Sequence, residues 1–373
     1  MLFRNEDVTF PLNMGITNFS KKNIKTLAPE ELWEILSKHA FKKYRANQIY
    51  KWLYTHHAQS FEEMTNITKA EREMLSQIFD ISALRVVRTE TSSDGTRKFL
   101  FQLVDGHTIE SVLIPDKDRQ TLCVSSQVGC QQACRFCLTG SSGFTRNLKS
   151  FEIADQVLEI SRFLEQAETR GITNIVLMGM GEPLANFEEV VKALKVITSE
   201  NGLGFSPRRV TVSTDGLVPE IAKLGKCGVK VNLAVSLNAT CDDVRDSIMP
   251  VNRRYSLKVL LDACRRFPLE PRRRITFEYV LLKGVNDSPV DAQRLVKLLG
   301  GIKCKVNLIP FNPFPGSDFK RPDNEALRRF QKILLDHHFT APVRESRGRD
   351  ISAACGQLRE KDSKIKTAET SKA

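Results

Sequence analysis

The sequence has 373 residues, of which 41% are hydrophobic and 27% are charged. This composition excludes intrinsic disorder, a collagen helix and a coiled coil for the bulk of the chain, and it provides enough apolar material for one large domain and a smaller companion. Lys and Arg exceed Asp and Glu by 56 − 44 = 12. A polyanion, with nucleic acid the first candidate, is therefore the expected partner, although a basic surface alone does not require one.

No apolar run of the sequence approaches the ~20 residues that cross a bilayer, and the first residues lack the apolar core of a signal peptide. We therefore expect a cytoplasmic protein that does not bind a membrane. Thiols are kept reduced in that compartment, so the nine cysteines predict metal-binding, catalytic or buried side chains rather than a disulfide framework.

Residues 1–82 are expected to form a small helical N-terminal accessory domain. Apolar residues recur there at helical spacing, as at Leu32, Ile35 and Leu36, and Pro29 with two following acids is typical of a helix start. Several aromatic residues stand among Lys and Arg in this region. Such residues can contact RNA, but at helical spacing they more often form a core.

Residues 83–119 change to an alternating pattern with two turn signals, Ser93-Asp-Gly95 and Asp105-Gly106. This pattern predicts an antiparallel β-hairpin extension. Residues 359–373 are rich in Lys, contain few apolar residues and are expected to form a disordered basic tail.

Between residues 120 and 358, short β-branched apolar runs alternate with amphipathic stretches. Strands are expected at 121–124, 174–177, 210–212, 231–235, 275–280 and 306–309. Helices are expected at 151–169, 186–200, 217–225, 256–267, 288–299 and 323–337. Repeated strand–helix units predict an α/β fold with parallel strands, either a doubly wound sheet or a whole or partial barrel. Polar or Gly-rich segments follow successive strands, which favours a barrel because its strand ends converge on one mouth.

Cys130, Cys134 and Cys137 form a C-x3-C-x2-C run after the first of these strands. Three thiolates at these spacings can bind one soft metal centre. A structural zinc site needs a fourth ligand, which Cys123 could supply, and the chain would then be a zinc-stabilised RNA-binding module. With three ligands, a four-iron cluster keeps one iron open for a substrate. This spacing resembles the signature of radical S-adenosylmethionine (SAM) enzymes.

The loop after the second expected strand, Met178-Gly-Met-Gly-Glu-Pro183, resembles the segment of that superfamily that contacts the amino group of the methionine moiety. A carboxylate at Glu182 suits an ammonium group, and Gly181 permits close approach of the backbone. Alone, Gly-Glu-Pro is more often a plain turn.

Longer stretches are similar to the RlmN/Cfr family of radical SAM RNA adenosine methyltransferases. They are residues 123–130, 179–184, 307–315 and 347–357. The likeness extends from about residue 23 to 358. It implies a partial (β/α)6 radical SAM barrel, one [4Fe-4S] cluster per chain held by Cys130, Cys134 and Cys137, and two molecules of SAM per turnover.

The resemblance also implies a mechanism. One SAM methylates Cys355, and a second, cleaved reductively at the cluster, gives a radical that activates this methyl group for addition to adenine. Glu110 matches the base that then removes the ring proton, and Cys123 matches the thiol that releases the product and leaves a disulfide. Without the resemblance, strand alternation predicts that Glu110 faces solvent, and Cys355 could be a buried thiol.

Further contacts to SAM are implied at the ends of the expected barrel strands. The matching positions are Gly181, Glu182, Ser213, Ser236, Leu237, Asn238 and Asn312. Family members commonly have His where this chain has Asn238, so that contact differs from the family pattern. An amide can still donate and accept hydrogen bonds. Cys227, Cys241, Cys264 and Cys304 match nothing in the pattern and are expected to be core or incidental thiols.

The housekeeping branch of this family methylates C2 of an adenosine in 23S rRNA, and some members also methylate an adenosine in the tRNA anticodon loop. The resistance branch methylates C8 of the same rRNA base. Val128 resembles the C2 branch, because the C8 branch has Cys there. The resemblance further implies an electron donor such as flavodoxin or ferredoxin, and a monomer is the simplest expectation. A radical SAM enzyme with another substrate remains an alternative.

Basic clusters are spread along the chain, at 42–43, 208–209, 253–254, 265–266, 272–274 and 328–329. Runs of charge are mostly solvated faces, so about half of these are not expected to touch RNA. An adenine in structured RNA must be splayed out to reach a barrel mouth, which favours loops over duplexes as substrates.

Overall fold

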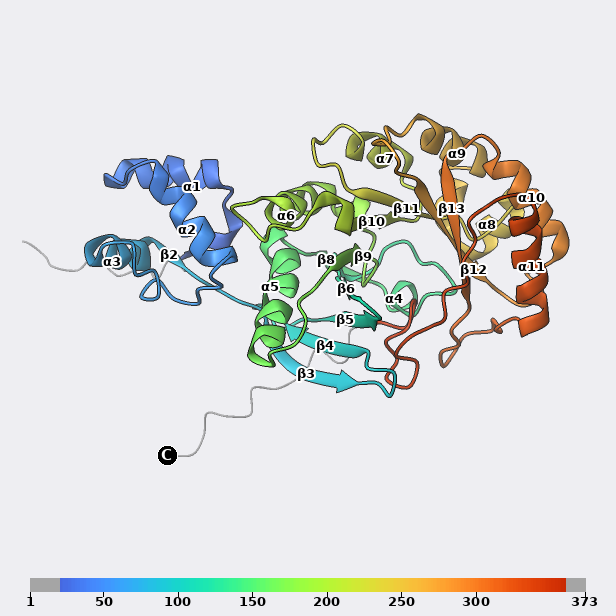
Figure 1. Cartoon of the computed structure of the whole chain (residues 1–373), viewed down its shortest axis with the longest axis horizontal. Helices are drawn as coiled ribbons and strands as arrows, with labels where there is room; N and C mark the ends of the chain where they lie inside the picture. Colours follow the sequence, from blue (N-terminus) through green and yellow to red (C-terminus); the bar gives the residue numbers. More distant parts are fainter. Residues whose placement is uncertain (1–20, 360–373) are drawn as a thin grey trace, which may run out of the picture.

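The structure, a computed structural model, describes residues 21–359 (Figure 1). The first twenty residues of the expected N-terminal domain lie outside this range. So does the expected basic tail, apart from Arg359. Within the described residues, no helix is long and apolar enough to cross a membrane.

The N-terminal part is a small helical unit at one end of the molecule (Figure 1). Its elements are β1 (Lys22–Asn23), η1 (Ile24–Thr26), α1 (Pro29–Leu36), η2 (Ser37–His39), α2 (Tyr44–Tyr54), α3 (Lys69–Ile78) and β2 (Phe79–Asp80). Helix α3 begins with a capping box, in which Thr68 and Glu71 satisfy each other's backbone N–H groups. Tyr50 and Tyr54 are buried in the core of this unit, whereas Tyr44 is exposed. Most of the aromatic residues thus serve packing.

One continuous sheet organises the rest of the described chain. Its nine strands follow the order β13-β12-β11-β10-β9-β6-β5-β4-β3. They are β3 (Arg85–Thr91), β4 (Arg97–Gln102), β5 (Thr108–Asp116), β6 (Arg119–Cys123), β9 (Asn174–Leu177), β10 (Val210–Thr214), β11 (Asn232–Ser236), β12 (Ile275–Leu281) and β13 (Cys304–Pro310). Strands β6 and β9 to β13 are parallel, and β3 to β5 extend the sheet with antiparallel pairing. The expected partial (β/α)6 barrel with an antiparallel extension is confirmed.

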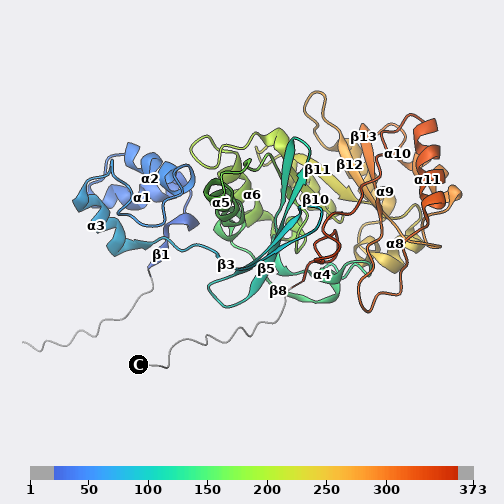
Figure 2. The same ribbon diagram turned by 60° about the horizontal axis from the view of Figure 1, so that its bottom comes forward.

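The connections between parallel strands carry helices that cover the outer face of the sheet (Figures 1 and 2). They are α5 (Ser150–Gln166), η3 (Pro183–Asn186), α6 (Phe187–Thr198), η4 (Pro207–Arg209), α7 (Val218–Leu224), α8 (Asp242–Ile248), η5 (Pro250–Arg253), α9 (Leu257–Arg266), α10 (Pro289–Leu299) and α11 (Asn324–Asp336). All six expected helices are present, and α8 is additional. An insertion also follows β6. It consists of the paired strands β7 (Gln127–Gly129) and β8 (Phe144–Asn147), with α4 (Leu138–Ser141) between them in the sequence.

A buried ion pair joins the N-terminal unit to the barrel. Lys25 Nζ lies 3.0 Å from Asp155 Oδ1, and both side chains are inaccessible to solvent. Asp155 belongs to α5, the helix that faces the N-terminal helices in Figure 2. Thr55 adds a hydrogen bond from Oγ1 to the carbonyl of Gly202 at 3.2 Å. The two units are therefore held by specific polar contacts as well as by packing.

Candidate active site

The three cysteines of the C-x3-C-x2-C run lie on the loop between β7 and α4. The backbone N–H of Cys130 donates to the carbonyl of Gly143 at 2.7 Å, so the β7–β8 ribbon fixes the start of the loop. Gly129 has a φ of +74°, and a Cβ there would lie 2.1 Å from that same carbonyl oxygen. Cys137 donates its N–H to the carbonyl of Cys134 at 3.1 Å. Local turns thus hold all three thiols on one short loop.

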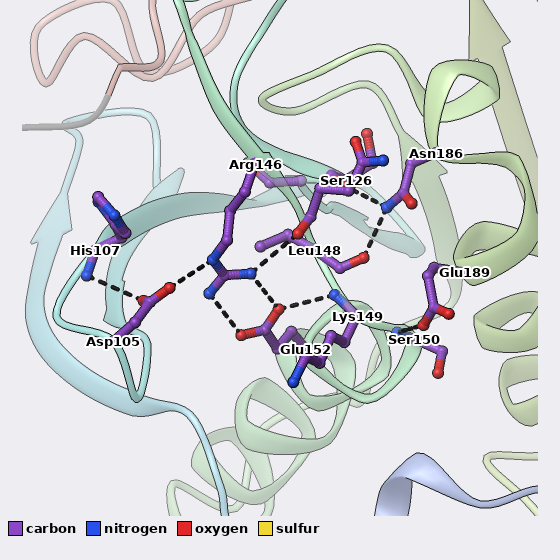
Figure 3. A network of polar contacts seen from close by, with 12 residues as sticks. Asp105, His107, Ser126, Arg146, Leu148, Lys149, Ser150, Glu152, Asn186 and Glu189 are labelled. Atoms are coloured by element: carbon purple, nitrogen blue, oxygen red, sulfur yellow. Dashed lines mark hydrogen bonds and ion pairs between the residues drawn. The ribbon is translucent and has the colours of Figure 1, made fainter.

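Arg146 of β8 anchors this ribbon to the barrel (Figure 3). Its guanidinium forms a bidentate pair with Glu152 at the start of α5, at 2.8 and 2.9 Å, and a further 2.5 Å contact with Asp105 at the β4–β5 turn. Glu152 also accepts the N–H of Lys149 at 2.8 Å. The ion pairs with these two carboxylates raise the pKa of Arg146 despite its partial burial. One side chain therefore joins the ribbon, the extension and the first barrel helix.

The environment of the thiols is rich in acids. Burial raises the pKa of Cys130, Cys134 and Cys137, and nearby Asp215 acts in the same direction. Cys134 Sγ lies 3.3 Å from Asp215 Oδ2. Burial, followed by the charge of Asp215, raises the pKa of Glu182 to about 8. These groups would ionise readily only next to a positively charged occupant.

Arg245 of α8 is a buried cation of this region, and four of its five N–H donors are already used. It donates to the carbonyls of Asp215, Ser236 and Leu237 and to the side chain of Asn252, at 2.7 to 3.1 Å. Soft thiolates are the ligands that iron–sulfur clusters use, and an ammonium or sulfonium group complements the carboxylates. The residues present therefore fit an iron–sulfur cluster with SAM beside it.

Among the described residues, no group of three or more His, Cys, Asp or Glu side chains is arranged to hold a single metal ion. Ligands of a four-iron cluster stand farther apart than ligands of one ion, because each binds a different iron. Cys123 does not join the three cysteines as a fourth ligand. Burial raises the pKa of Cys123, and the charge of Cys355 raises it further. The arrangement does not support the zinc alternative.

Glu182 lies where the sequence motif predicts, at the end of the loop after β9. It is buried, and its carboxylate accepts the N–H groups of Leu184 at 2.9 Å and Asp215 at 2.7 Å. Gly181 has a φ of +97°, and a Cβ there would come within 2.5 Å of Gln127. Gln127 in turn accepts the N–H of Glu182 through Oε1 at 2.9 Å. The glycine is thus required by close contact with Gln127, which also bonds the backbone of Glu182.

The remaining expected SAM positions divide into two groups. Ser213 and Ser236 end neighbouring strands and are partly accessible, and Asn312 has a buried Oδ1 without a hydrogen-bond partner. An acceptor oxygen without a partner can receive a hydrogen bond from a donor group of a bound ligand. Leu237 is buried, and the Asn238 amide already bonds to Val280 N–H at 2.8 Å and Met249 Sδ at 3.2 Å. The side chains of Leu237 and Asn238 pack at the end of β11. The Asn238 amide is bonded within the protein and is not directed toward a ligand.

The segment of residues 344–359, called the C-terminal strap here, carries Cys355 across the mouth of the barrel. The carbonyl of Gly356 accepts the N–H of Leu138 in α4 at 2.7 Å, and the carbonyl of Cys355 accepts Asn312 Nδ2 at 3.3 Å. Cys355 is an exposed residue of the strap, although its thiol is turned toward the protein. Burial of the thiol, followed by the charge of Glu278, raises the pKa of Cys355 to about 11.

Glu110 of β5 lies under the strap rather than in solvent. Its side chain is 1% exposed, with Lys98 Nζ 3.3 Å from Oε1 and the N–H of Arg359 donating to Oε2 at 3.1 Å. The expectation from strand alternation was therefore wrong, because β5 is covered on both faces along its first six residues. Glu110 is thus covered by the same strap that carries Cys355.

Three residues that shape this site were not identified from the sequence. Asp215 follows β10 directly, so the rule that polar strand ends build the mouth could have found it. Arg245 lies on the short helix α8, which the periodicity did not reveal. Gln127 lies within a motif, yet nothing in its residue type distinguishes it from its neighbours. Of the other thiols, Cys264 and Cys304 are buried, whereas Cys227 and Cys241 are half-buried.

Comparisons with known proteins agree along almost the whole chain. Residues 124–296 match the model of the radical SAM superfamily, and residues 22–81 match the ribosomal RNA large subunit methyltransferase N-terminal domain. The dual-specificity RNA methyltransferase RlmN of Desulfosudis oleivorans is 55% identical over 347 residues, which are 92% of this chain and 93% of that protein. RlmN of Geobacter sulfurreducens is 56% identical over 91% of this chain and 92% of its own length.

A crystal structure of a radical SAM methyltransferase from Sphaerobacter thermophilus superimposes with a TM-score of 0.86 at 47% identity. The alignment covers 91% of this chain and 99% of that one. The similarity therefore includes the N-terminal unit, the extension and the barrel together.

Proposed function

The chain belongs to the RlmN family of radical SAM RNA methyltransferases, and on that premise we propose that it methylates C2 of an adenosine in 23S rRNA and of an adenosine in the tRNA anticodon loop. The observation that carries the proposal is that the strap bearing Cys355 is bonded through Gly356 to α4, which follows the three-cysteine loop, and through Arg359 to Glu110. Val128, which resembles the C2 branch, is buried in the β7–β8 ribbon next to that loop.

A [4Fe-4S] cluster held by Cys130, Cys134 and Cys137 supplies, when bound, an electron for reductive cleavage of SAM. We propose that each turnover uses two molecules of SAM and that a flavodoxin- or ferredoxin-type protein delivers the electron. Glu182 would hold the ammonium group of SAM, since its buried carboxylate is already oriented by two N–H donors. The partly accessible Ser213 and Ser236 and the unsatisfied Oδ1 of Asn312 support further contacts to SAM at the same mouth.

Cys355 would carry the new carbon to the RNA. C2 of adenine has no usable lone pair, so direct displacement on a sulfonium methyl group cannot methylate it. A methyl group first transferred to Cys355 Sγ can reach the base after loss of one hydrogen atom, which gives a covalent S–CH2–C2 link between protein and RNA. The exposed position of Cys355 on the strap and the hydrogen bond from Asn312 to its carbonyl support this role.

Resolution of that link would require Glu110 and Cys123. The adduct formed by the S-methylene radical would lose one electron to the oxidised cluster, and Glu110 would remove the proton from C2. The thiolate of Cys123 would then attack the sulfur of Cys355. The bond between sulfur and the product carbon then breaks, and the electron pair takes up a proton to complete the methyl group. A disulfide between Cys123 and Cys355 remains, which a reductant must open before the next turnover.

The test is mass spectrometry of nucleosides from 23S rRNA and tRNA after reaction with SAM and a reductant. Wild-type protein is expected to produce 2-methyladenosine in both RNAs, and Cys355→Ala none. Formation of 8-methyladenosine would instead assign the chain to C8 chemistry. Unchanged methylation by Cys355→Ala would rule out the two-cysteine mechanism.

A further inference from the structure

A basic cavity lies at the opposite end of the barrel from the proposed active site. It has a volume of about 590 Å³ and is lined by Arg208, Arg272, Arg273, Arg274 and Lys305. All five precede or begin the parallel strands β10, β12 and β13. Strand β12 has seven residues, and a parallel strand rises ~3.3 Å per residue, so roughly 20 Å separates this cavity from the strand ends that carry the active site.

The strand register explains why polar side chains meet there. Thr211 pairs with Asn232, and Thr276 pairs with Lys305, at the first or second positions of four adjacent parallel strands. All four of these residues line the cavity. The wall therefore offers hydroxyl, amide and ammonium groups from the sheet itself, with the arginines contributed by the segments that lead into the strands.

The positive charge of this cavity is not compensated by its own wall, because no carboxylate lines it. Arg273 and Arg274 donate to neutral oxygens, the carbonyl of Lys230 and Thr340 Oγ1. Within the described residues, Arg208, Arg272 and Lys305 form no side-chain hydrogen bond and no ion pair within 4 Å. Glu270 lies outside the wall and pairs with Lys230 at 2.8 Å, although its charge also acts on Arg273 and Arg208.

Lys305 lies deeper in the cavity, where burial and the surrounding positive charge lower its pKa. Burial lowers the pKa of Lys305, and the charges of Arg344, Arg274 and Arg119 lower it further, whereas Glu278 acts in the opposite direction. Cations that surround a half-buried lysine are stabilised by an anion placed among them. Guanidinium groups in particular bind phosphate oxygens through paired donors.

We propose that this cavity binds a phosphodiester group of the RNA substrate, at a segment remote from the adenosine that is methylated. The inference rests on the proposed function only in taking RNA as the partner. The cations Arg208, Arg272 and Arg274 are exposed at the rim, so a polymer backbone can reach them without entering the barrel. Lys305 lies deeper and would face a phosphate from below. The site would therefore bind RNA independently of its sequence and position it on the enzyme.

The test compares RNA binding by Arg208→Gln/Arg272→Gln with that of Arg328→Gln/Arg329→Gln, an exposed pair on α11 whose loss changes the net charge equally. Neither Arg208 nor Arg272 holds another described side chain, so folding is expected to be unaffected. The logarithm of the binding constant is measured against the logarithm of salt concentration, without SAM or reductant. The slope should become shallower by about 1 for each phosphate contact removed, hence by up to about 2, in the cavity variant only.

Equal slopes in the cavity variant, the α11 variant and wild type would overturn the proposal. Lys305→Gln provides a second variant, expected to lose one contact. Titration of inorganic phosphate into wild type and the cavity variant distinguishes a phosphate of RNA from a free phosphate ion. If wild type binds phosphate but the RNA slope of the cavity variant is unchanged, the site binds a free anion and the RNA assignment is refuted. Methylation is assayed separately, so a shallower slope in a protein that makes no methyladenosine would refute the proposed function and leave this inference intact.

Discussion

Glu110 has the environment of a base that must act out of contact with bulk water. Lys98 supports its ionised form, and the N–H of Arg359 holds one carboxylate oxygen in place. In the proposed cycle the proton at C2 becomes acidic only after the covalent link to Cys355 has formed, so Glu110 would act after that step. The role proposed for Glu110 therefore depends on position as much as on basicity.

Glu110→Gln preserves the shape of the side chain but removes its capacity to accept a proton. We expect methylation to fall by about 10²- to 10⁴-fold, the usual contribution of a general base, with RNA bound as tightly as before. The matched control is Glu90→Gln, which removes the other carboxylate near Lys98, at 3.7 Å, without reaching the site. The measurement is 2-methyladenosine formed per enzyme over time, and similar losses in both variants would count against a catalytic Glu110.

Cys123→Ala is expected to stop the cycle one step later. The thiol that should attack Cys355 is absent, so protein covalently linked to RNA should accumulate after the link has formed. A denaturing gel detects this species as a slowly migrating band. The control is Cys264→Ala, which removes a buried thiol from α9 that is assigned no role. Normal turnover with no band in Cys123→Ala would contradict the proposed resolving step.

At the scale of elements, the antiparallel extension has a purpose that its sequence pattern does not reveal. The β3–β4 turn binds the C-terminal strap, because Asp94 accepts the N–H of Gly348 at 2.9 Å and Asp350 accepts Ser92 Oγ at 2.6 Å. Lys98 of β4 donates to the carbonyl of Ile351 at 2.6 Å. The extension therefore serves as the support on which the segment bearing Cys355 is laid.

The strap contacts predict a dependence of stability on pH. Although partial burial acts in the other direction, hydrogen bonds from Thr96, Gly348 and Ser92 hold the pKa of Asp94 at about 2, below its ordinary value. A lowered pKa contributes stability that is present above the ordinary value and is lost as pH falls through about 2. The difference in unfolding free energy between wild type and Asp94→Asn should therefore narrow from pH 4 to pH 2, as measured by urea unfolding. A difference that does not vary with pH would contradict this assignment.

Repeating strand–helix units were predictable because each buries an apolar run between two amphipathic helices, and strand β9 was predicted to the residue. The β7–β8 ribbon was not, since its three- and four-residue strands are stabilised by tertiary contacts such as those of Arg146 rather than by local pattern. The burial of Glu110 was missed for a related reason. The strap that covers it follows some 250 residues later, and alternation within one strand carries no information about such a cover.

At the scale of the whole molecule, the N-terminal unit is attached through a buried ion pair whose balance is delicate. Burial raises the pKa of Asp155 to about 6, even though Lys25 lies 3.0 Å away and acts in the opposite direction. The cost of removing both charges from water thus offsets much of their attraction. The pair specifies where the unit docks more than it strengthens the docking.

Asp155→Ala should cost about 3–5 kcal/mol, because it leaves the Lys25 charge buried and uncompensated. The double variant Lys25→Met/Asp155→Leu should recover most of that loss. Both Trp residues of the chain, Trp33 and Trp52, lie in the N-terminal unit, so tryptophan fluorescence during urea unfolding reports on it directly. Glu165→Ala, which breaks an exposed pair with His57, should cost less than about 1 kcal/mol. A double variant as unstable as Asp155→Ala would contradict this account.

The fastening of the C-terminal strap to β3–β5 also governs when the enzyme becomes competent during its own synthesis. The contacts of Ile351 with Lys98 and of Arg359 with Glu110 join residues 253 and 249 positions apart. A ribosome that has just completed the cysteine loop must add 355 − 137 = 218 further residues before Cys355, the proposed methyl acceptor, exists. Closure of so long a loop is entropically costly and slow. The strap, and with it Cys355, can therefore take its place on the extension only after the rest of the barrel has been synthesised.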